Sequence, residues 1–515
     1  MKRIVSALDK LNWGRPCAVF ALCATVAIAL PAQTLTTIFS FDGTDGADAS
    51  AALVQATDGN FYGTTWDGGA NGFGTVFRIT PSGALTILYS FCSLGVYPIC
   101  PDGSYPNGGL VQASDGDFYG TTEAGGANGG GTIGNGAGTV FKITASGTLT
   151  TLYSFCAQSG CVDGASSYAG LVQAANGNFY GTTYYGGAIA GPYGYGAGTV
   201  FQITASGTLT TLYSFCSRSG CVDGYSPYAA LVQATNGDFY GTTPAGGAHG
   251  SGGTIFKITP SGMLTTLYSF CSQSGCTDGA ASLAGLVEAT NGDFYGTTKY
   301  GGASDDGTVF KVTPAGTLTT LHSFCSQSGC TDGANPAAGL VEATDGDFYG
   351  TTVFGGTSAC PPQHGCGTVF KITPAGMLTT VYSFCPQGGY PSGCTDGEFP
   401  IAGLLQATSG DFYGTTQHGG LCGQCGGTLF SLSVGLSPFV KTQPHSGKVG
   451  AAITILGTDL TGATSVSFNG TPAAFKVVSA TEITTIVPAG ATTGKIQVTT
   501  PRGALFSSGP FLVMP

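Results

Sequence analysis

The chain has 515 residues, of which 42% are hydrophobic and only 8% are charged, and it contains 88 glycines. This composition is too apolar and aromatic for a disordered protein, and too rich in glycine, threonine and serine for a helical one. The formal net charge of −11, with no basic stripe along the chain, argues against nucleic acid or an anionic membrane as a partner.

Residues 1–32 have the pattern of a secretory signal peptide. Four basic residues (Lys2, Arg3, Lys10 and Arg15) precede an apolar run of 14 residues (17–30), and Pro31-Ala32-Gln33 follows it. The run is shorter than the roughly 20 residues of a transmembrane helix. We therefore predict cleavage near Ala32, a secreted, cell-surface or periplasmic location, and no membrane span in the mature chain. Removing this segment changes the formal net charge from −11 to −14, because four basic residues and one acidic residue leave with it.

The rest of the chain up to residue 434 is dominated by a repeat built around the phrase FYGTT. The phrase recurs with spacings between 54 and 64 residues, at 61–65, 118–122, 179–183, 239–243, 294–298, 348–352 and 412–416. Each copy follows a strand-like segment and an Asp-Gly, Asn-Gly or Ser-Gly turn. It precedes two further strand-like segments, such as GTVFKIT (367–373) and LTTLYSF (209–215). Four strands per unit at this period predict the blades of a β-propeller.

The two ends of the repeat region are incomplete in a complementary way. The mature chain opens with LTTIFSF (35–41), a fourth strand without the three that normally precede it, and the seventh unit ends at GTLFSLS (427–433), its third strand. Pairing these two segments would remove the free sheet edges, whereas a linear solenoid would need capping units. We predict an all-β chain: residues 33–434 form a seven-bladed β-propeller closed by the N-terminal strand, followed by an Ig-like β-sandwich.

The repeat resembles known families. The Tyr-Gly and Gly-Gly phrases resemble a kelch repeat, although the tryptophan usual late in a kelch unit is missing. The whole unit is more similar to the tandem GloVer repeat of exported bacterial proteins, a family that implies no established activity. Residues 437–515, with phrases such as PHSGKVGAAITILG and TSVSFNGTPAAF, resemble an IPT/TIG domain, an immunoglobulin-like module that usually spaces or docks other domains.

Sixteen cysteines remain after signal cleavage, and an even number in an exported chain predicts disulfides. A zinc site needs four ligands, and only Cys422-Gly-Gln-Cys425 has the spacing of half of one, so we predict no metal. The predicted pairs are Cys92–Cys100, Cys156–Cys161, Cys216–Cys221, Cys271–Cys276, Cys325–Cys330, Cys360–Cys366, Cys385–Cys394 and Cys422–Cys425.

Loop lengths indicate which face of the predicted propeller carries function. Loops between the second and third strands, and between the fourth strand and the next unit, vary in length, and variable loops on a rigid scaffold are where binding residues concentrate. Aromatic residues and one histidine directly after FYGTT fall on this face and could stack on a sugar or peptide, or simply pack beneath the loops. The candidate ligand-binding residues are Trp66, Tyr184, Tyr185, Tyr300, Phe354 and His418.

Acidic residues on the same face offer a second possibility. An Asp-Gly stands in the loop that leads into every unit, and its recurrence favours a structural role in the turn over catalysis. These aspartates are Asp42, Asp102, Asp163, Asp223, Asp278, Asp332 and Asp396. Irregular carboxylates could instead serve a polysaccharide hydrolase or lyase, namely Asp67, Glu123, Asp305 and Glu398.

No nucleophile elbow or zinc-protease motif is present. The sequence therefore favours a non-enzymatic exported binding or interaction protein, without a cofactor, whose ligand is an extracellular glycan or a surface protein. The alternatives are a polysaccharide-active hydrolase or lyase on a propeller scaffold, and a purely structural envelope protein.

Overall fold

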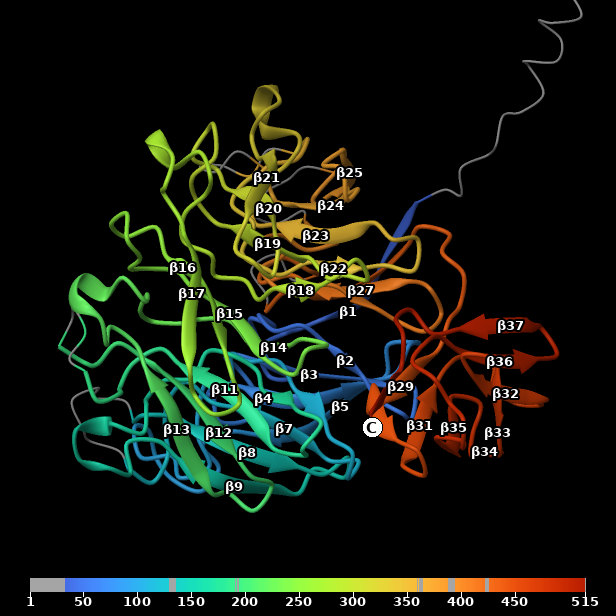
Figure 1. Cartoon of the computed structure of the whole chain (residues 1–515). Helices are drawn as coiled ribbons and strands as arrows, with labels where there is room; N and C mark the ends of the chain where they lie inside the picture. Colours follow the sequence, from blue (N-terminus) through green and yellow to red (C-terminus); the bar gives the residue numbers. More distant parts are fainter. Residues whose placement is uncertain are drawn as a thin grey trace, which may run out of the picture.

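The computed structural model describes residues 33–128, 136–189, 191, 194–358, 360, 365–387, 394–421 and 426–514. Within these residues the regular elements are β-strands, apart from four 3-10 turns. Figure 1 shows the repeat region from blue to orange, with the C-terminal strands as a red lobe beside it. The predicted signal peptide and the Cys422–Cys425 pair lie outside the described residues.

The repeat forms seven four-stranded antiparallel sheets, numbered 1 to 7 along the chain and each following the predicted strand order. The first strands are β2 (Val54–Gln55), β6 (Val111–Gln112), β10 (Val172–Gln173), β14 (Val232–Gln233), β18 (Val287–Glu288), β22 (Val341–Glu342) and β26 (Leu405–Gln406). The second strands are β3 (Phe61–Thr65), β7 (Phe118–Thr121), β11 (Phe179–Thr183), β15 (Phe239–Thr243), β19 (Phe294–Thr298), β23 (Phe348–Thr352) and β27 (Phe412–Thr415).

The outer half of each sheet contains the two remaining strands. The third strands are β4 (Thr75–Ile79), β8 (Thr139–Ile143), β12 (Thr199–Ile203), β16 (Thr254–Ile258), β20 (Thr308–Val312), β24 (Thr368–Ile372) and β28 (Thr428–Ser433). The fourth strands are β5 (Leu85–Ser90), β9 (Leu149–Ser154), β13 (Leu209–Ser214), β17 (Leu264–Ser269), β21 (Leu318–Ser323), β25 (Leu378–Ser383) and, in sheet 7, β1 (Thr34–Ser40). β1 pairs antiparallel with β28, with Thr34 opposite Ser433. The arrangement of repeated sheets is propeller-like.

The first two letters of FYGTT join neighbouring sheets. The tyrosine of one sheet packs ring to ring on the phenylalanine of the next, and both rings are buried. Such aromatic contacts add to the stabilisation that comes from buried area alone. The pairs are Tyr62–Phe118, Tyr119–Phe179, Tyr180–Phe239, Tyr240–Phe294, Tyr295–Phe348, Tyr349–Phe412 and Tyr413–Phe61, with centroids 4.0 to 4.3 Å apart.

The last three letters have equally specific roles. A Cβ on Gly63 would stand 2.6 Å from Cζ of Phe77 and 2.8 Å from Cδ2 of Leu53, so a larger residue does not fit between these core side chains. The first threonine donates to a backbone carbonyl of the following sheet, as Thr121 Oγ1 does to Ala169 O at 2.7 Å. The second pairs within its own sheet with the first threonine of the third strand, as Thr122 Oγ1 does with Thr139 Oγ1 at 3.0 Å.

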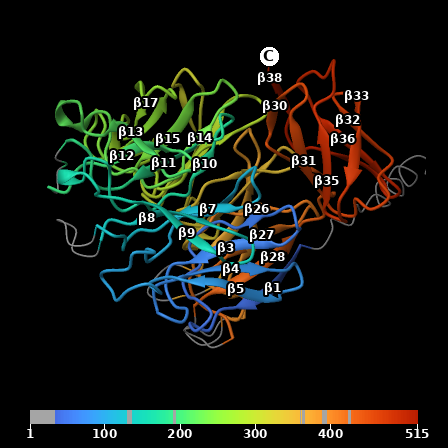
Figure 2. The same cartoon turned by 90° about the horizontal axis from the view of Figure 1, so that it is seen from below.

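The C-terminal residues form two four-stranded sheets that enclose a core of their own, including Ile455, Val466, Phe468 and Val498. Figure 2 shows these strands together on one side of the repeat region. One sheet contains β29 (Lys441–Gln443), β31 (Ala452–Leu456), β35 (Glu482–Ile486) and β34 (Phe475–Val477). The other contains β33 (Thr471–Ala473), β32 (Ser465–Phe468), β36 (Ile496–Thr500) and β37 (Gly503–Phe506), while β30 (Ser446–Lys448) and β38 (Leu512–Met514) form a parallel pair.

The C-terminal domain contacts the turns between the first and second strands of the repeat. Phe439 N donates to Thr408 O at 3.0 Å, and Thr481 Oγ1 donates to Thr57 O at 3.1 Å. The Lys441 ammonium donates to Gln406 O at 2.6 Å, and burial lowers the pKa of Lys441 to about 8. These contacts place this domain against the face with the uniform turns.

Candidate ligand-binding site

A cavity of about 590 Å³ opens on the face with the variable loops, and all seven sheets contribute to it. Its wall is built from the short segments that precede each first strand. A leucine stands directly before the first strand of each sheet, and the residue before that leucine is glycine or alanine in all seven sheets. These small side chains leave the space open. These residues are Ala52, Gly109, Gly170, Ala230, Gly285, Gly339 and Gly403.

Two residues earlier in the same segments, the repeat breaks down. Six residue types occupy this position in the seven sheets, and the series is Ser50, Asn107, Tyr168, Tyr228, Leu283, Ala337 and Ile401. Residues that follow the second strands add Trp66, Lys299, Val353, Phe354 and Gln417. Sheets 1 to 4 thus supply a polar and aromatic arc, whereas sheets 5 to 7 supply an arc that is mainly apolar, with Lys299 and Gln417 as its polar members.

Glu123 holds two aromatic walls of the cavity in place. Its carboxylate accepts a hydrogen bond from Trp66 Nε1 at 3.0 Å and from the Tyr168 hydroxyl at 2.9 Å. Tyr168 in turn stacks on Tyr228 with centroids 4.9 Å apart. Burial, together with the Glu123 carboxylate, raises the pKa of Tyr228 to about 12 and that of Tyr168 well above its ordinary value, so both phenols stay protonated near neutral pH.

Trp66 is further supported from outside the cavity. Its ring stacks on Tyr105 at 4.8 Å, and Tyr105 contacts Phe73 and Tyr97 edge to face. Tyr97 belongs to the loop closed by the Cys92–Cys100 disulfide. A side chain supported in this way loses little conformational entropy when a ligand binds.

The charged groups of the cavity lie in different parts of its wall. Asp48 precedes the first strand of sheet 1, and His418 Nδ1 stands 3.6 Å from its carboxylate. Burial raises the pKa of Asp48, the nearby His418 opposes that shift, and Asp67 reinforces it. Lys299, the one basic residue among the described residues that line the cavity, follows the second strand of sheet 5, and its ammonium stands 5.4 Å from the Tyr300 ring centroid.

The structure distributes the predicted binding residues unevenly. Trp66 and Phe354 line the cavity, and His418 contacts Asp48, another residue of the cavity wall. Tyr184 packs edge to face against Tyr168 at 5.3 Å, just behind the wall. Tyr185 packs against Tyr184 and Tyr195 away from the cavity wall, and Tyr300 points outward with 45% of its surface exposed.

Several cavity residues escaped the sequence analysis, namely Asp48, Asn107, Tyr168, Tyr228 and Lys299. All but Lys299 precede a first strand, in loops whose repeated features are the Asp-Gly and the cysteines. The available signal was the break in an otherwise regular phrase at the position two residues before the glycine or alanine. Glu123, proposed as a catalytic carboxylate, instead supports the cavity wall.

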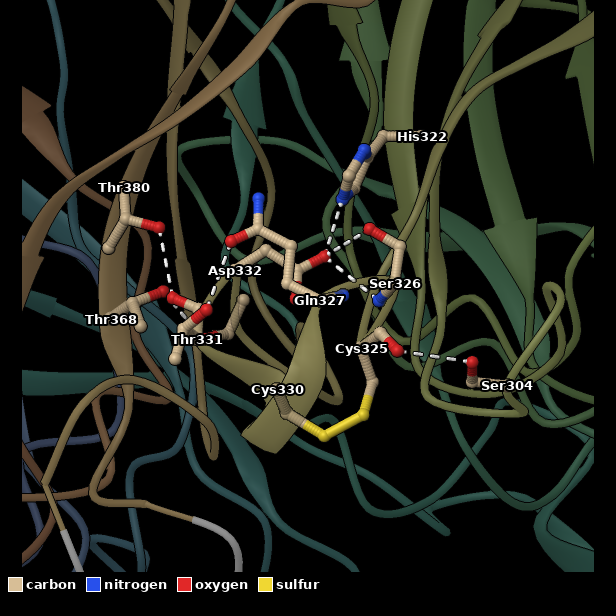
Figure 3. A network of polar contacts seen from close by, with 11 residues as sticks. Ser304, His322, Cys325, Ser326, Gln327, Cys330, Thr331, Asp332, Thr368 and Thr380 are labelled. Atoms are coloured by element: carbon tan, nitrogen blue, oxygen red, sulfur yellow. Dashed lines mark hydrogen bonds and ion pairs between the residues drawn. A yellow bond between two sulfur atoms is a disulfide. The ribbon is translucent and has the colours of Figure 1, made fainter.

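The recurrent Asp-Gly aspartates have the structural role that was predicted for them. Asp332 is fully buried and accepts hydrogen bonds from His322 Nε2 at 3.0 Å, Ser326 N at 3.0 Å and Ser326 Oγ at 2.7 Å. Figure 3 shows these contacts next to the Cys325–Cys330 disulfide. Tyrosine takes the place of His322 in sheets 1 to 4 and 6, as in Tyr153–Asp163 at 2.8 Å, whereas sheet 7 has Phe39 there. Asp42, in the loop without cysteines, is the exposed exception.

Seven of the eight predicted disulfides are confirmed among the described residues: Cys92–Cys100, Cys156–Cys161, Cys216–Cys221, Cys271–Cys276, Cys325–Cys330, Cys360–Cys366 and Cys385–Cys394. The last two pairs gather four buried sulfur atoms within 4.8 Å of one another. As disulfides they offer no thiolate, so these residues do not fit a zinc ion while they are oxidised.

The remaining proposed carboxylates lie outside the cavity wall. Asp305 accepts a hydrogen bond from Gly301 N at 2.8 Å, and Asp67 contributes to the wall neither by side chain nor by backbone. Glu398 is buried, and burial and Asp396 raise its pKa to about 7, but it too lies apart from the cavity. The described residues therefore do not place a pair of these carboxylates in the cavity.

Comparison with known proteins places the chain in a family. The Gloeobacter/Verrucomicrobia repeat matches residues 24–222, 134–286 and 195–395, and the IPT/TIG domain matches residues 439–512. The chain therefore belongs to the Gloeobacter/Verrucomicrobia repeat family and has a C-terminal IPT/TIG domain. A search of curated proteins finds no match.

Solved structures resemble the chain only distantly. A fungal alcohol oxidase of the AA5 family in complex with copper is 14% identical, with a TM-score of 0.48 over 93% of this chain and 99% of that one. A luciferin-regenerating enzyme (10% identity, TM-score 0.38, 79% and 97% covered) and a protein of unknown function from Bacteroides thetaiotaomicron (12%, 0.37, 78% and 96%) also match. At these scores the matches carry no argument about activity.

In the part of the chain that the structure describes, no helix has the length and apolar character needed to cross a membrane.

Proposed function

We propose that this chain is an exported, non-enzymatic glycan-binding protein whose repeat region is a seven-bladed β-propeller closed by β1. The observation that carries the binding role is the cavity, where a regular scaffold presents a different side chain from nearly every sheet. If every sheet bound a ligand in the same way, the cavity-lining position would carry the same residue in every sheet. A single specific site instead requires different side chains at equivalent positions.

Closure is supported by contacts between sheets 7 and 1 of the kind that join the other sheets. Tyr413 packs on Phe61 at 4.1 Å, and Thr415 Oγ1 donates to Ala49 O at 2.6 Å. Gln55 accepts a hydrogen bond from Thr408 N at 2.9 Å, as Gln173 does from Ser114 N at 3.1 Å between sheets 2 and 3. A closed ring explains why the fourth strand of sheet 7 comes from the N-terminus.

The chemistry of the cavity favours a sugar. Trp66 and Tyr228 offer aromatic surface of the kind that contacts the C–H face of a pyranose, while Asp48, Asn107 and Gln417 can exchange hydrogen bonds with hydroxyl groups. The volume of about 590 Å³ is in the range of small-ligand sites. Export is supported by the pattern of residues 1–32 and by the seven described disulfides.

The test uses the mature chain, residues 33–515, with a panel of soluble and insoluble polysaccharides. Binding is measured by co-sedimentation and calorimetry, and new reducing or unsaturated ends are scored in the same samples. We expect binding without release. Trp66→Ala should weaken binding at least about tenfold, and Trp66→Phe less, because the phenyl ring keeps part of the aromatic surface.

Tyr195→Ala is the matched control, since Tyr195 is an exposed aromatic residue in the loop after the second strand of sheet 3 and lies outside the cavity wall. Equal losses in Trp66→Ala and Tyr195→Ala would contradict the proposed site. Release of new ends would indicate a hydrolase or lyase instead. Absence of both binding and release would favour a protein partner or a structural envelope role.

A further inference from the structure

We propose that the cavity selects a sugar that carries a carboxylate, such as a terminal uronic acid, and that Lys299 binds that carboxylate. This inference rests on the proposed glycan-binding function and adds the class of ligand. It begins from the placement of one cation in the wall of a cavity that belongs to an acidic protein.

Other lysines in the repeat are paired with carboxylates of their own sheet. Lys142 Nζ stands 2.6 Å from Asp117, Lys257 Nζ stands 3.5 Å from Asp238, and Lys311 Nζ stands 3.6 Å from Asp293. These lysines share one position on the third strand, so the repeat itself supplies both charge and partner. Within the described residues, the Lys299 ammonium has no carboxylate at ion-pair distance. It lies over the Tyr300 ring, 5.4 Å from the ring centroid.

The main chain of Lys299 is fixed on both sides. Its N–H donates to Ala281 O at 3.1 Å, and its carbonyl accepts a hydrogen bond from Asn335 Nδ2 at 3.0 Å. The repeat does not require a particular residue at this position, directly after FYGTT. The corresponding residues of the other sheets are Trp66, Glu123, Tyr184, Pro244, Val353 and Gln417. A lysine held at this point of the wall is available for an anionic group in the cavity.

The negative groups of the site are on another part of the wall. Asp48 lies in sheet 1, and Glu123 stands behind Trp66 and Tyr168 of sheets 1 and 3. A ligand carboxylate is repelled there and attracted by Lys299 in sheet 5, whereas ligand hydroxyls can donate to Asp48. This polarity fixes the orientation of a sugar with one acidic group and disfavours an amino sugar whose ammonium would face Lys299.

The experiment compares one ligand in two chemical forms. The probe is an oligosaccharide that ends in glucuronic acid, and the same oligosaccharide after its carboxyl group has been reduced to the alcohol. Binding to the mature chain is measured by calorimetry at low and moderate salt. We expect the acidic form to bind about tenfold more tightly, and the difference to shrink as salt rises.

Lys299→Met should remove the preference, so that the acidic and the neutral form bind with equal affinity within about twofold. Lys311→Met is the matched control, because it removes a lysine of the same sheet that already has a partner and lies outside the cavity wall. Thermal unfolding of both variants verifies that they are folded.

The outcomes separate the two proposals. Equal affinity of wild-type protein for both forms would overturn the carboxylate preference and leave glycan binding standing. Loss of both forms in Lys299→Met, with an unchanged melting temperature, would also overturn it, because the role of Lys299 would not depend on the carboxylate. Failure of the wild-type chain to bind any glycan of the larger panel would overturn the proposed function itself.

Discussion

The buried aspartates of the Asp-Gly loops allow one prediction to be worked out in detail, for Asp223→Asn. The Oδ2 atom of Asp223 accepts hydrogen bonds from Tyr213 Oη at 2.7 Å, Ser217 N at 2.9 Å and Ser217 Oγ at 2.9 Å, and the residue has no exposed surface. Asparagine has the same shape but one acceptor fewer. If the amide nitrogen takes the place of Oδ2, it faces three donors. If it takes the place of Oδ1, it faces Arg218 N, which in the wild-type protein donates to Oδ1.

The expected cost follows from these contacts. A hydrogen bond to a buried charged acceptor contributes about 1.5–3 kcal/mol, and a buried donor left without a partner costs about 1–3 kcal/mol. The loss of one or two such bonds, after partial relaxation of the loop, gives about 2–5 kcal/mol in the free energy of unfolding. The loop also contains the Cys216–Cys221 disulfide, which limits how far it can relax.

Asp42→Asn is the matched control. Asp42 occupies the corresponding position in the first loop but is exposed, and its carboxylate bonds only to Thr44 and Asp45 nearby in sequence. We expect a change below about 0.5 kcal/mol there. Guanidinium unfolding of both variants, followed by fluorescence and circular dichroism, measures the difference. Equal effects of the two substitutions, or a change below about 0.5 kcal/mol for Asp223→Asn, would refute the reasoning.

Three further predictions test the ring, the core and the contact between domains. Gln55→Ala and Gln173→Ala should each lower the free energy of unfolding by about 1–2 kcal/mol, and no loss for Gln55→Ala alone would contradict closure of the ring. Gly241→Ala should destabilise by about 1–3 kcal/mol in the same assay, because its Cβ would stand 2.6 Å from the Phe256 ring. Burial lowers the pKa of Lys441 from 10.5 to about 8. Between pH 8 and 10.5 the unfolded chain therefore binds more protons than the folded chain, and the free energy of unfolding rises with pH by at most about 3 kcal/mol. Lys441→Met should abolish that rise between pH 7.5 and 9.5 and stabilise the chain at pH 7, which unfolding midpoints across this range would verify.

The repeat and its strands were accessible from the sequence because each letter of FYGTT satisfies a structural constraint that recurs in every unit. The glycine must be small against Phe77, and the two threonines bond at fixed offsets, so periodicity alone reveals four strands in each unit. The disulfide pairs were accessible for a similar reason, since their cysteines lie five to nine residues apart in loops that begin and end at one point of a sheet.

Which residues line the cavity depended on tertiary structure. Trp66 was visible as an aromatic residue that interrupts the pattern, but Tyr168 comes from a different unit and reaches Trp66 only through Glu123. Tyr300 follows FYGTT just as Tyr185 and Phe354 do, yet it points outward while Phe354 lines the cavity. The direction of each side chain depends on the loops packed beside it, and those loops differ in length.

The sequence by itself determined the all-β class, the strand order within each unit, the family and the disulfides, because these depend on contacts between residues near one another in the chain or on spacings that repeat. Only the tertiary structure decided which residues share the cavity, that Lys299 lines it with no carboxylate at ion-pair distance among the described residues, and that the C-terminal domain contacts the face with the uniform turns. Those features depend on side chains from units tens to hundreds of residues apart, which arrive at one place only when the sheets pack together.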